Sequence, residues 1–340
     1  MPTVDISTLT ETAIRRQQDL KMLPYAVLRE TLGLHGITLM PGIQNKDVMT
    51  SFYRKQGILR PYYAGMTIVP SDVGKAKENT LTVYKAFASV KDNIQNYKSI
   101  SVGPDVLLGK NQTKKHPWEM VMLTSIIRTF AEDIIDALFP AKRDTGDQSP
   151  TGAFDGYDTL IDVLVAATDI SLAIGNLVNT GTLAGPVDAN DTDCADFLLA
   201  FWRSAHPQLK AVKSMLLVPA DIGDYYDDAY FNKYKTKPIV DEFNRSVLHG
   251  TGGKCQIVRS TAMGTGQRIM LTVPGNLDFG MDTLSDADFV QVRNPWEDPN
   301  DIQFWIQSDY GCRIREIHPK VFQVNEGTPV ANALSGDYVS

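Results

Sequence analysis

The longest uninterrupted helical pattern in the chain runs from residue 116 to residue 142 and reads HPWEMVMLTSIIRTFAEDIIDALFPAK. Pro117 suits the first helical turn, where a backbone N–H has no partner within the helix, and Pro140 ends the pattern. About 22 residues at 1.5 Å each make a rod of roughly 33 Å, as long as a small domain is wide. Apolar residues recur along it at spacings of three and four: Met120, Leu123, Ile127, Phe130, Ile134 and Leu138. The pattern predicts a core helix laid across a sheet, which we call the spine helix.

The charged residues of this segment exclude a membrane span, although its length would suit one. They are Arg128, Glu132, Asp133 and Asp136. No other segment is apolar enough to enter a bilayer, and the N-terminus lacks the basic and apolar run of a signal peptide. We therefore expect no membrane contact, and a protein that is made and kept inside a cell or released by lysis.

Length and charge limit the possible classes further. The chain has 340 residues, enough for two or three domains with proper cores. It carries 33 basic and 40 acidic residues, and this balance argues against a surface that wraps nucleic acid. Its three cysteines, Cys194, Cys255 and Cys312, lie far apart and form no C-x-x-C pair, so we expect reduced thiols without a disulfide framework or a zinc site.

The N-terminal part predicts an amphipathic helical arm. Thr8 followed by Glu11 matches a capping box, and a helix should continue from there to Pro24. A second helical piece should follow and end at Gly33. The apolar stripe of such an arm packs either on its own domain or on a neighbouring subunit. We expect three of its residues to become buried only on assembly: Ile14, Leu20 and Leu28.

Residues 57–70 and 79–90 are rich in aromatic and β-branched residues and flank the polar stretch SDVGKAKE. This arrangement predicts a long β-hairpin with a charged tip. A two-stranded ribbon is only marginally stable alone in water. The hairpin must therefore lie either on its own domain or across an adjacent subunit.

The middle third alternates helix and strand patterns, as in a compact domain that mixes both. The segments are FDGYDTLIDVL from Phe154, the amphipathic CADFLLAFWRSAHPQLK, the short buried strand KSMLLVP and the helix DIGDYYDDAYFNKYK. The last third predicts strands joined by turns: CQIV, RIMLTV, FVQVR, IQFWIQSDYGCRIR and KVFQV. The fold class expected from these patterns is α+β.

No catalytic constellation is visible in the sequence. The five histidines are dispersed, and neither H-E-x-x-H nor G-x-S-x-G occurs. Asp224 and Asp228 would share a helix face and could form an acid/base pair, but acids in a first turn more often complement the helix dipole. We expect no catalytic residue, no cofactor and no metal site. This absence favours a structural or binding protein over an enzyme.

The order of parts, a helical arm, a hairpin, a spine helix, an inserted mixed domain and returning strands, resembles the major capsid proteins of tailed bacteriophages. Their shell fold is named for phage Hong Kong ninety-seven. The segments FDGYDTLIDVL, RIMLTVPG and IQFWIQSDYGCRIREIHPKVFQV are similar to parts of that family. The resemblance implies the following divisions: an N-terminal arm at 1–50, an E-loop hairpin at 51–100, a P-domain spine helix at 101–150, an A-domain at 151–285, P-domain return strands at 286–330 and a flexible tail at 331–340.

The resemblance implies a head protein that assembles with copies of itself, as pentamers and hexamers, into an icosahedral shell in the host cytoplasm and remains in the virion. The shell would enclose double-stranded DNA without sequence-specific binding. A scaffolding protein, a portal and a maturation protease are the other partners that it implies. No long coiled segment precedes the arm, so scaffolding would be a separate protein or the chain a processed form. The expected subunit-interface residues are Ile14, Leu20, Leu28, Tyr62, Tyr63, Lys75, Lys77, Tyr84 and Phe87.

Two other functions stay open. An encapsulin-like protein compartment shares the shell fold and differs in its cargo, which is a protein enzyme instead of DNA. A carboxylate-dependent hydrolase using Asp224 and Asp228 belongs to a different class. Lys75 and Lys77 have the residue type that forms covalent cross-links in some capsid relatives, but nothing in the sequence implies such a bond.

Overall fold

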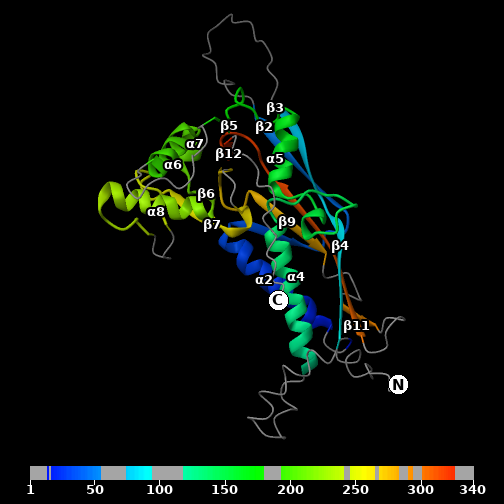
Figure 1. Ribbon diagram of the computed structural model, residues 1–340. Helices are drawn as coiled ribbons and strands as arrows, with labels where there is room; N and C mark the ends of the chain where they lie inside the picture. Colours follow the sequence, from blue (N-terminus) through cyan, green and yellow to red (C-terminus); the bar gives the residue numbers. More distant parts are fainter. Residues whose placement is uncertain are drawn as a thin grey trace, which may run out of the picture.

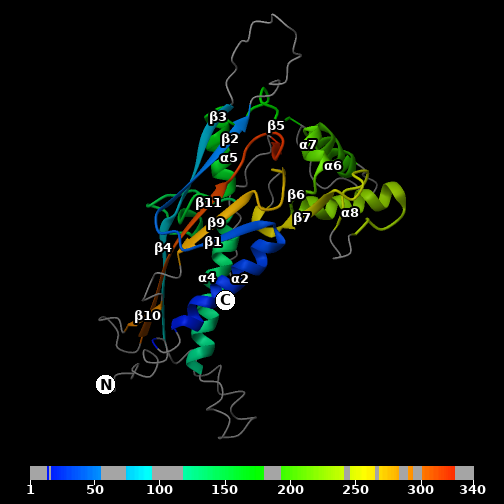
Figure 2. The ribbon, with the colours of Figure 1, turned by 180° about the vertical axis from the view of Figure 1, so that it is seen from behind.

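The computed structural model describes residues 14, 17–54, 74–93, 118–179, 193–240, 246–264, 268–282, 290–293 and 301–325. Within these residues the chain forms two five-stranded sheets and a separate two-stranded ribbon. The helices lie along one sheet and beside the other, and the ribbon extends from one end of the molecule (Figures 1 and 2). The mixture of helices and sheets confirms the expected α+β class.

The first sheet has the strand order β1-β9-β11-β10, and β4 pairs with the remaining edge of β11. Only β1 and β9 run parallel to each other; the other pairs are antiparallel. The longest strand, β11, joins three partners, so it is the centre of this sheet. The strand bounds are β1 Ile37–Pro41, β4 Tyr84–Asn93, β9 Leu277–Asp282, β10 Val290–Arg293 and β11 Asp301–Ile314.

The spine helix α4 (Trp118–Ala137) packs against this sheet as predicted. Leu123, Ile127 and Ile134 are buried in a core shared with β9 and β11. The ring of Phe130 meets the ring of Tyr310 from β11, with 6.1 Å between centroids. The predicted core helix across a sheet is therefore confirmed, although it ends at Ala137, before the expected stop at Pro140.

The N-terminal arm is one helix, α2 (Gln17–Leu34), and not two pieces that break at Pro24. Proline inside a helix removes one backbone hydrogen bond and normally ends or kinks it. Here α2 packs along α4, and Leu28 and Leu32 are fully buried in the same core. This packing stabilises the helix through the proline, so the predicted break was wrong.

The second sheet has the order β5-β12-β8-β6-β7. Strand β6, between β8 and β7, is buried along its whole length, which confirms the strand predicted from KSMLLVP. Met215 and Leu217 on one face join the core of the spine helix, whereas Leu216 and Val218 on the other face join a second core. The strand bounds are β5 Leu177–Val178, β6 Ser214–Pro219, β7 Cys255–Ser260, β8 Met270–Thr272 and β12 Phe322–Asn325.

Helices α6, α7 and α8 cover the second core, on the side of the sheet away from the spine helix (Figures 1 and 2). The amphipathic helix expected over CADFLLAFWRSAHPQLK is divided at His206, because Pro207 begins a new helix and His206 caps it by accepting a hydrogen bond from the Gln208 N–H at 3.2 Å. The helix bounds are α5 Tyr157–Ala166, α6 Asp193–Ser204, α7 Pro207–Ala211 and α8 Ala220–Tyr234, with short 3-10 helices at Pro150–Gly152 and Thr261–Met263.

The ribbon differs from the expected hairpin. Its strands are β2 (Lys46–Arg54) and β3 (Gly74–Thr82), which pair antiparallel from Lys46 opposite Thr82 to Arg54 opposite Gly74. The expected strand 57–70 lies outside the described residues. The expected strand 79–90 is divided at Val83 between β3 and β4, and residues 74–78 of the expected tip are part of β3.

The strands near the C-terminus do not divide between the sheets at residue 285 as expected. β9, within the range expected for the A-domain, pairs with β1 and β11 in the first sheet. β12, expected among the P-domain strands, pairs with β5 and β8 in the second sheet. Alternating patterns identify strands but carry no information on which distant strand becomes the partner.

Gly311 of β11 offers a test of how the ribbon joins the first sheet. A Cβ atom at this position would overlap the carbonyl oxygen of Thr82 at the end of β3. We expect Gly311→Ala to lower the free energy of unfolding by about 1–3 kcal/mol, the usual cost of overpacking. Gly33→Ala is the control, because no atom lies within 4 Å of its Cβ position in α2. Equal urea midpoints for both variants would contradict this packing.

Candidate assembly site

We call the end of the ribbon at Lys46 and Thr82 the ribbon root. A buried ionic network fixes it to the first sheet. Arg313 on β11, 3% exposed, donates from its Nη1 to Asp47 of β2 at 2.8 Å and from its Nη2 to Asp278 of β9 at 2.8 Å. Arg315 donates from Nε to the other carboxylate oxygen of Asp278 at 2.7 Å. The backbone oxygen of Asp278 accepts a hydrogen bond from the hydroxyl of Tyr157 at 2.9 Å. The fully buried carboxylate of Asp278 thus joins the sheet to the ribbon through Arg313, and its backbone oxygen joins the sheet to α5.

Further contacts hold the ribbon along its length. The Ser51 hydroxyl and the Asn79 amide both donate to the backbone oxygen of Arg315. The ammonium of Lys77 pairs with Asp169, beyond the end of α5, at 2.5 Å. The two-stranded ribbon is therefore held at its root and side, while its end at Arg54 and Gly74 points away from the sheets (Figure 1).

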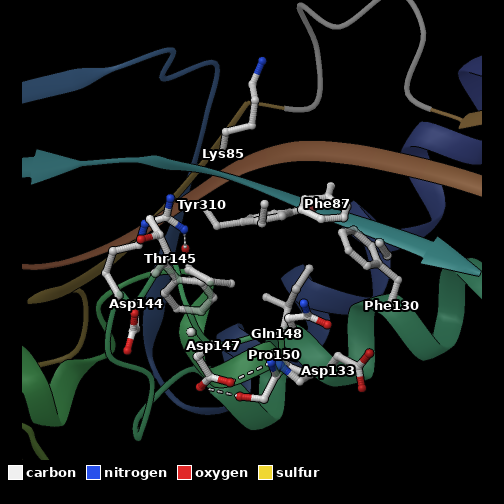
Figure 3. Close-up of a pocket in the computed structure, with 18 of the residues that line it drawn as sticks. Lys85, Phe87, Phe130, Asp133, Asp144, Thr145, Asp147, Gln148, Pro150 and Tyr310 are labelled. Carbon is white, nitrogen blue, oxygen red and sulfur yellow. Dashed lines mark hydrogen bonds between the residues drawn. The ribbon is translucent and has the colours of Figure 1, made fainter.

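A groove of about 740 Å³ lies between β4, the spine helix and the loop that follows it. Its floor is apolar and includes Phe130, Ile134 and Tyr310. Its far wall is formed by residues 143–153, and Asp133, Asp144 and Asp147 stand around it (Figure 3). We call this feature the acid-rimmed groove. An apolar floor with an acidic border fits a segment that carries apolar and basic side chains.

The rim acids differ in their surroundings. Partial burial, and then the charges of Asp136 and Glu132, raise the pKa of Asp133. Asp147 is held ionised, because hydrogen bonds from the backbone and the hydroxyl of Ser149 lower its pKa. The cation Arg143 is engaged within its own chain: it donates to the Ala153 oxygen at 3.0 Å and lies 5.3 Å from the Tyr84 ring centroid. Lys85 of β4 also lines the groove, so its border holds three acids and two cations.

The expected interface residues of the arm differ in exposure. Ile14 is 66% exposed and remains available to a partner. Leu20 lies in α2, but its side chain is outside the described part. Leu28 is fully buried against its own chain. The expectation that it becomes buried only on assembly was wrong, because α2 packs on α4 within one subunit.

The expected interface residues of the hairpin lie on three different segments. Tyr62 and Tyr63 are outside the described residues, and Lys75 lies in β3 with its side chain outside them. Lys77 pairs with Asp169, as described. Tyr84 and Phe87 belong to β4 and line or adjoin the groove; Phe87 is 62% exposed and stacks on Trp305 at 4.9 Å.

The acidic cluster of α8 lies beside Arg259. Asp224 and Asp227 both contact the guanidinium of Arg259, and Asp228 is exposed. Among the described residues, no group of three or more His, Cys, Asp or Glu side chains is placed to hold a metal ion. In the same part of the chain, no helix is long and apolar enough to cross a membrane. The three cysteines are buried, and none of them is in a disulfide.

Sequence reasoning missed Asp278, Arg313, Trp305 and the loop acids of the groove. Asp278 stands in a strand that no strong pattern marks, in PGNLDFGMD. One signal was present: Arg313 and Arg315 lie at alternate positions at the end of a segment that alternates apolar and polar residues. Charged residues are almost never fully buried without partners, so such a pair on a core strand indicates a buried acid elsewhere.

Comparison with solved structures reveals the same fold in viral shells. A chain of the satellite phage P4 procapsid with its size determination (Sid) protein matches at a TM-score of 0.57 and 12% identity, over 91% of this chain and 90% of that one. The capsid of Myoviridae phage XM1 matches at 0.52 and 8% identity, over 87% and 90%. The capsid of an empty GTA particle matches at 0.50 and 11% identity, over 86% and 88%.

No family model and no curated protein sequence matches the chain. The structural matches extend over 91% and 87% of this chain. At identities near one in ten, they establish the arrangement of the backbone. The chain therefore has the capsid fold of tailed bacteriophages, the type named for phage Hong Kong ninety-seven, as its sequence resemblance predicted.

Proposed function

We propose that the chain is the major capsid protein of a tailed bacteriophage and assembles with copies of itself into an icosahedral shell around double-stranded DNA. The observation that carries this proposal is the capsid fold, matched over about nine tenths of the chain. The ribbon supports the proposed self-assembly on physical grounds, because a two-stranded sheet that extends beyond its own domain is stabilised by contact with another subunit. Pentamers and hexamers would be the building units, and the virion the final location.

We propose a structural role without catalysis. Asp224 of α8 pairs with Arg259 and Asp228 is exposed, and mutation of both acids to Asn should leave assembly unchanged. Scaffolding protein, portal and maturation protease are partners of the proposed role. The shell wall would confine the DNA without binding it tightly, since 33 basic against 40 acidic residues leave no surplus of cations.

The encapsulin-like compartment is the second candidate, because the fold serves both. The cargo separates the two functions. Particles isolated from the native source should contain duplex DNA that resists nuclease until the shell is opened. Particles that contain a folded enzyme and no DNA would favour the compartment instead.

Sedimentation velocity of the purified full-length chain tests self-assembly directly. We expect a population that sediments far faster than the 37.6 kDa subunit and grows with protein concentration. A single slow species at all concentrations and salt conditions would count against the shell function.

A further inference from the structure

Two histidines in separate segments, His206 and His318, form the same local structure. Each precedes a proline, and its Nδ1 accepts a hydrogen bond from the backbone N–H two residues later. The distance from Nδ1 to the donating nitrogen is 3.2 Å for Gln208 and 3.1 Å for Lys320. Because an accepting Nδ1 carries no proton, the neutral ring has its proton on Nε2, the ring nitrogen farther from the backbone. Each histidine therefore offers an N–H donor at the outer end of its ring.

The fold brings these two histidines together beside the second sheet. The side-chain amide of Gln323 in β12 donates to the Ser204 hydroxyl at 2.9 Å, which ties the strand after His318 to the end of α6 before His206. Charges also act across this junction: burial, and then the charges of Lys320 and His206, lower the pKa of His318. The two rings and the Lys320 ammonium thus form one group, which we call the histidine cluster.

The chain around the histidine cluster carries positive charge without acids. Residues 197–220 contain Arg203, Lys210 and Lys213 but no aspartate or glutamate, and residues 317–325 contain no acid either. The whole chain has 40 acidic residues, so two such stretches that meet in the fold make a locally basic region. Both charges that shift the pKa of His318 are positive. An anion bound among these groups would relieve their mutual repulsion.

A metal ion does not fit this arrangement of donors. Histidine binds a metal through a nitrogen lone pair, and a lone pair on Nε2 requires the proton on Nδ1. That proton would point at the backbone N–H of Gln208 or of Lys320, each of which already donates to Nδ1. Two Nε2–H groups and an ammonium are hydrogen-bond donors, which is the set that binds an oxyanion.

We propose that His206, His318 and Lys320 bind a phosphate group through the two Nε2–H donors and the ammonium. The ligand is a tetrahedral oxyanion, carried either by the backbone of DNA or by free inorganic phosphate. The site goes beyond the proposed shell function and does not depend on it. Protonation of the histidines adds positive charge, so the anion should bind more tightly as the pH falls through the range in which histidine titrates. One such site per subunit is compatible with DNA that is confined without tight binding.

Equilibrium dialysis of labelled sulfate against the purified full-length chain tests the site. Sulfate has the tetrahedral shape of phosphate and keeps one charge over the pH range in which histidine titrates. We expect saturable binding of one sulfate per subunit. The binding should be about tenfold tighter at about pH 5.5 than at about pH 8, because the histidines are charged only at the lower pH.

Asparagine variants separate the anion site from the two turns. His206→Asn and His318→Asn keep an oxygen acceptor near the position of Nδ1, so each turn retains its backbone hydrogen bond. The Nε2–H donor and the titratable charge are lost. Each variant should weaken sulfate binding about tenfold at the lower pH, and the double variant should remove the pH dependence. Lys254→Gln is the control; it removes an exposed lysine before β7, an edge strand of the same sheet, and should bind sulfate as wild type does.

Two competitors identify the source of the phosphate group. Displacement of sulfate by inorganic phosphate alone would assign free phosphate as the ligand, and displacement by a short DNA duplex as well would assign the DNA backbone; either result supports the site. Displacement by neither would overturn it. Sulfate that does not bind saturably, or that binds equally to wild type and to both asparagine variants, would also overturn the proposal. The shell function would stand in each case, because sedimentation tests it separately.

Discussion

Asp278→Ala should lower the free energy of unfolding by about 3–5 kcal/mol, the largest loss that we expect from a single substitution. The carboxylate is fully buried and accepts hydrogen bonds from Arg313 and Arg315. Its removal leaves a buried guanidinium without its main counter-charge, and breaking a buried pair from one side has this cost. Urea unfolding followed by circular dichroism measures the change.

Two variants make the result specific. Asp278→Asn keeps the size and one acceptor oxygen, so its loss should be smaller than that of the alanine variant. Asp224→Ala removes an acid whose side chain is 71% exposed and should cost no more than about 1 kcal/mol. Asp278→Ala and Asp224→Ala with equal effects would show that the buried network does not stabilise the ribbon root.

Asp158→Asn should stabilise the protein at neutral pH, although the aspartate contacts an arginine. Asp158 lies in the first turn of α5, and Arg268 donates to its backbone oxygen at 3.0 Å and to Asp162 at 2.7 Å. Burial raises the pKa of Asp158 from 3.8 to about 6, while the charge of Arg268 opposes this rise. The rise corresponds to roughly 3 kcal/mol against the ionised form.

The direction in which the contribution of Asp158 to stability changes with pH follows from proton binding. Between pH 4 and 6 the folded chain holds a proton on Asp158 that the unfolded chain has released, so the contribution of Asp158 to stability falls as the pH increases. At pH 4 wild type and Asp158→Asn should have similar unfolding free energies; by pH 7 the variant should be more stable by about 1–3 kcal/mol. Asp221→Asn, exposed on α8, is the control. A variant that loses stability relative to wild type as the pH increases would contradict this.

The sequence predicted the elements whose local pattern is strong. The spine helix has apolar residues at Leu123, Ile127 and Ile134 on one face, and β6 is a short apolar run ended by Pro219, and both appear as expected. The hairpin was misplaced because residues 57–70 are richer in β-forming residues than KDVMTSFYR of β2, which is the strand that pairs with β3. Propensity ranks segments but does not choose partners.

The site was predictable only in part. Exposed Phe87 was recognised from its place on an aromatic strand. The network of Asp47, Asp278 and Arg313 unites segments more than 200 residues apart, and the groove combines a strand edge, a helix and a loop. Such sites depend on tertiary packing, which a pattern along one segment does not encode. Leu28 shows the same limit, because an amphipathic stripe does not reveal which surface covers it.

Cryo-electron microscopy of the purified full-length chain tests the central claim most directly. The account predicts closed shells with icosahedral symmetry, built from rings of five and six subunits in which each subunit has its spine helix and both sheets as described. The density should also show each ribbon in contact with a neighbouring subunit. Dispersed subunits, or small oligomers that never close into a shell under any assembly condition, would contradict it.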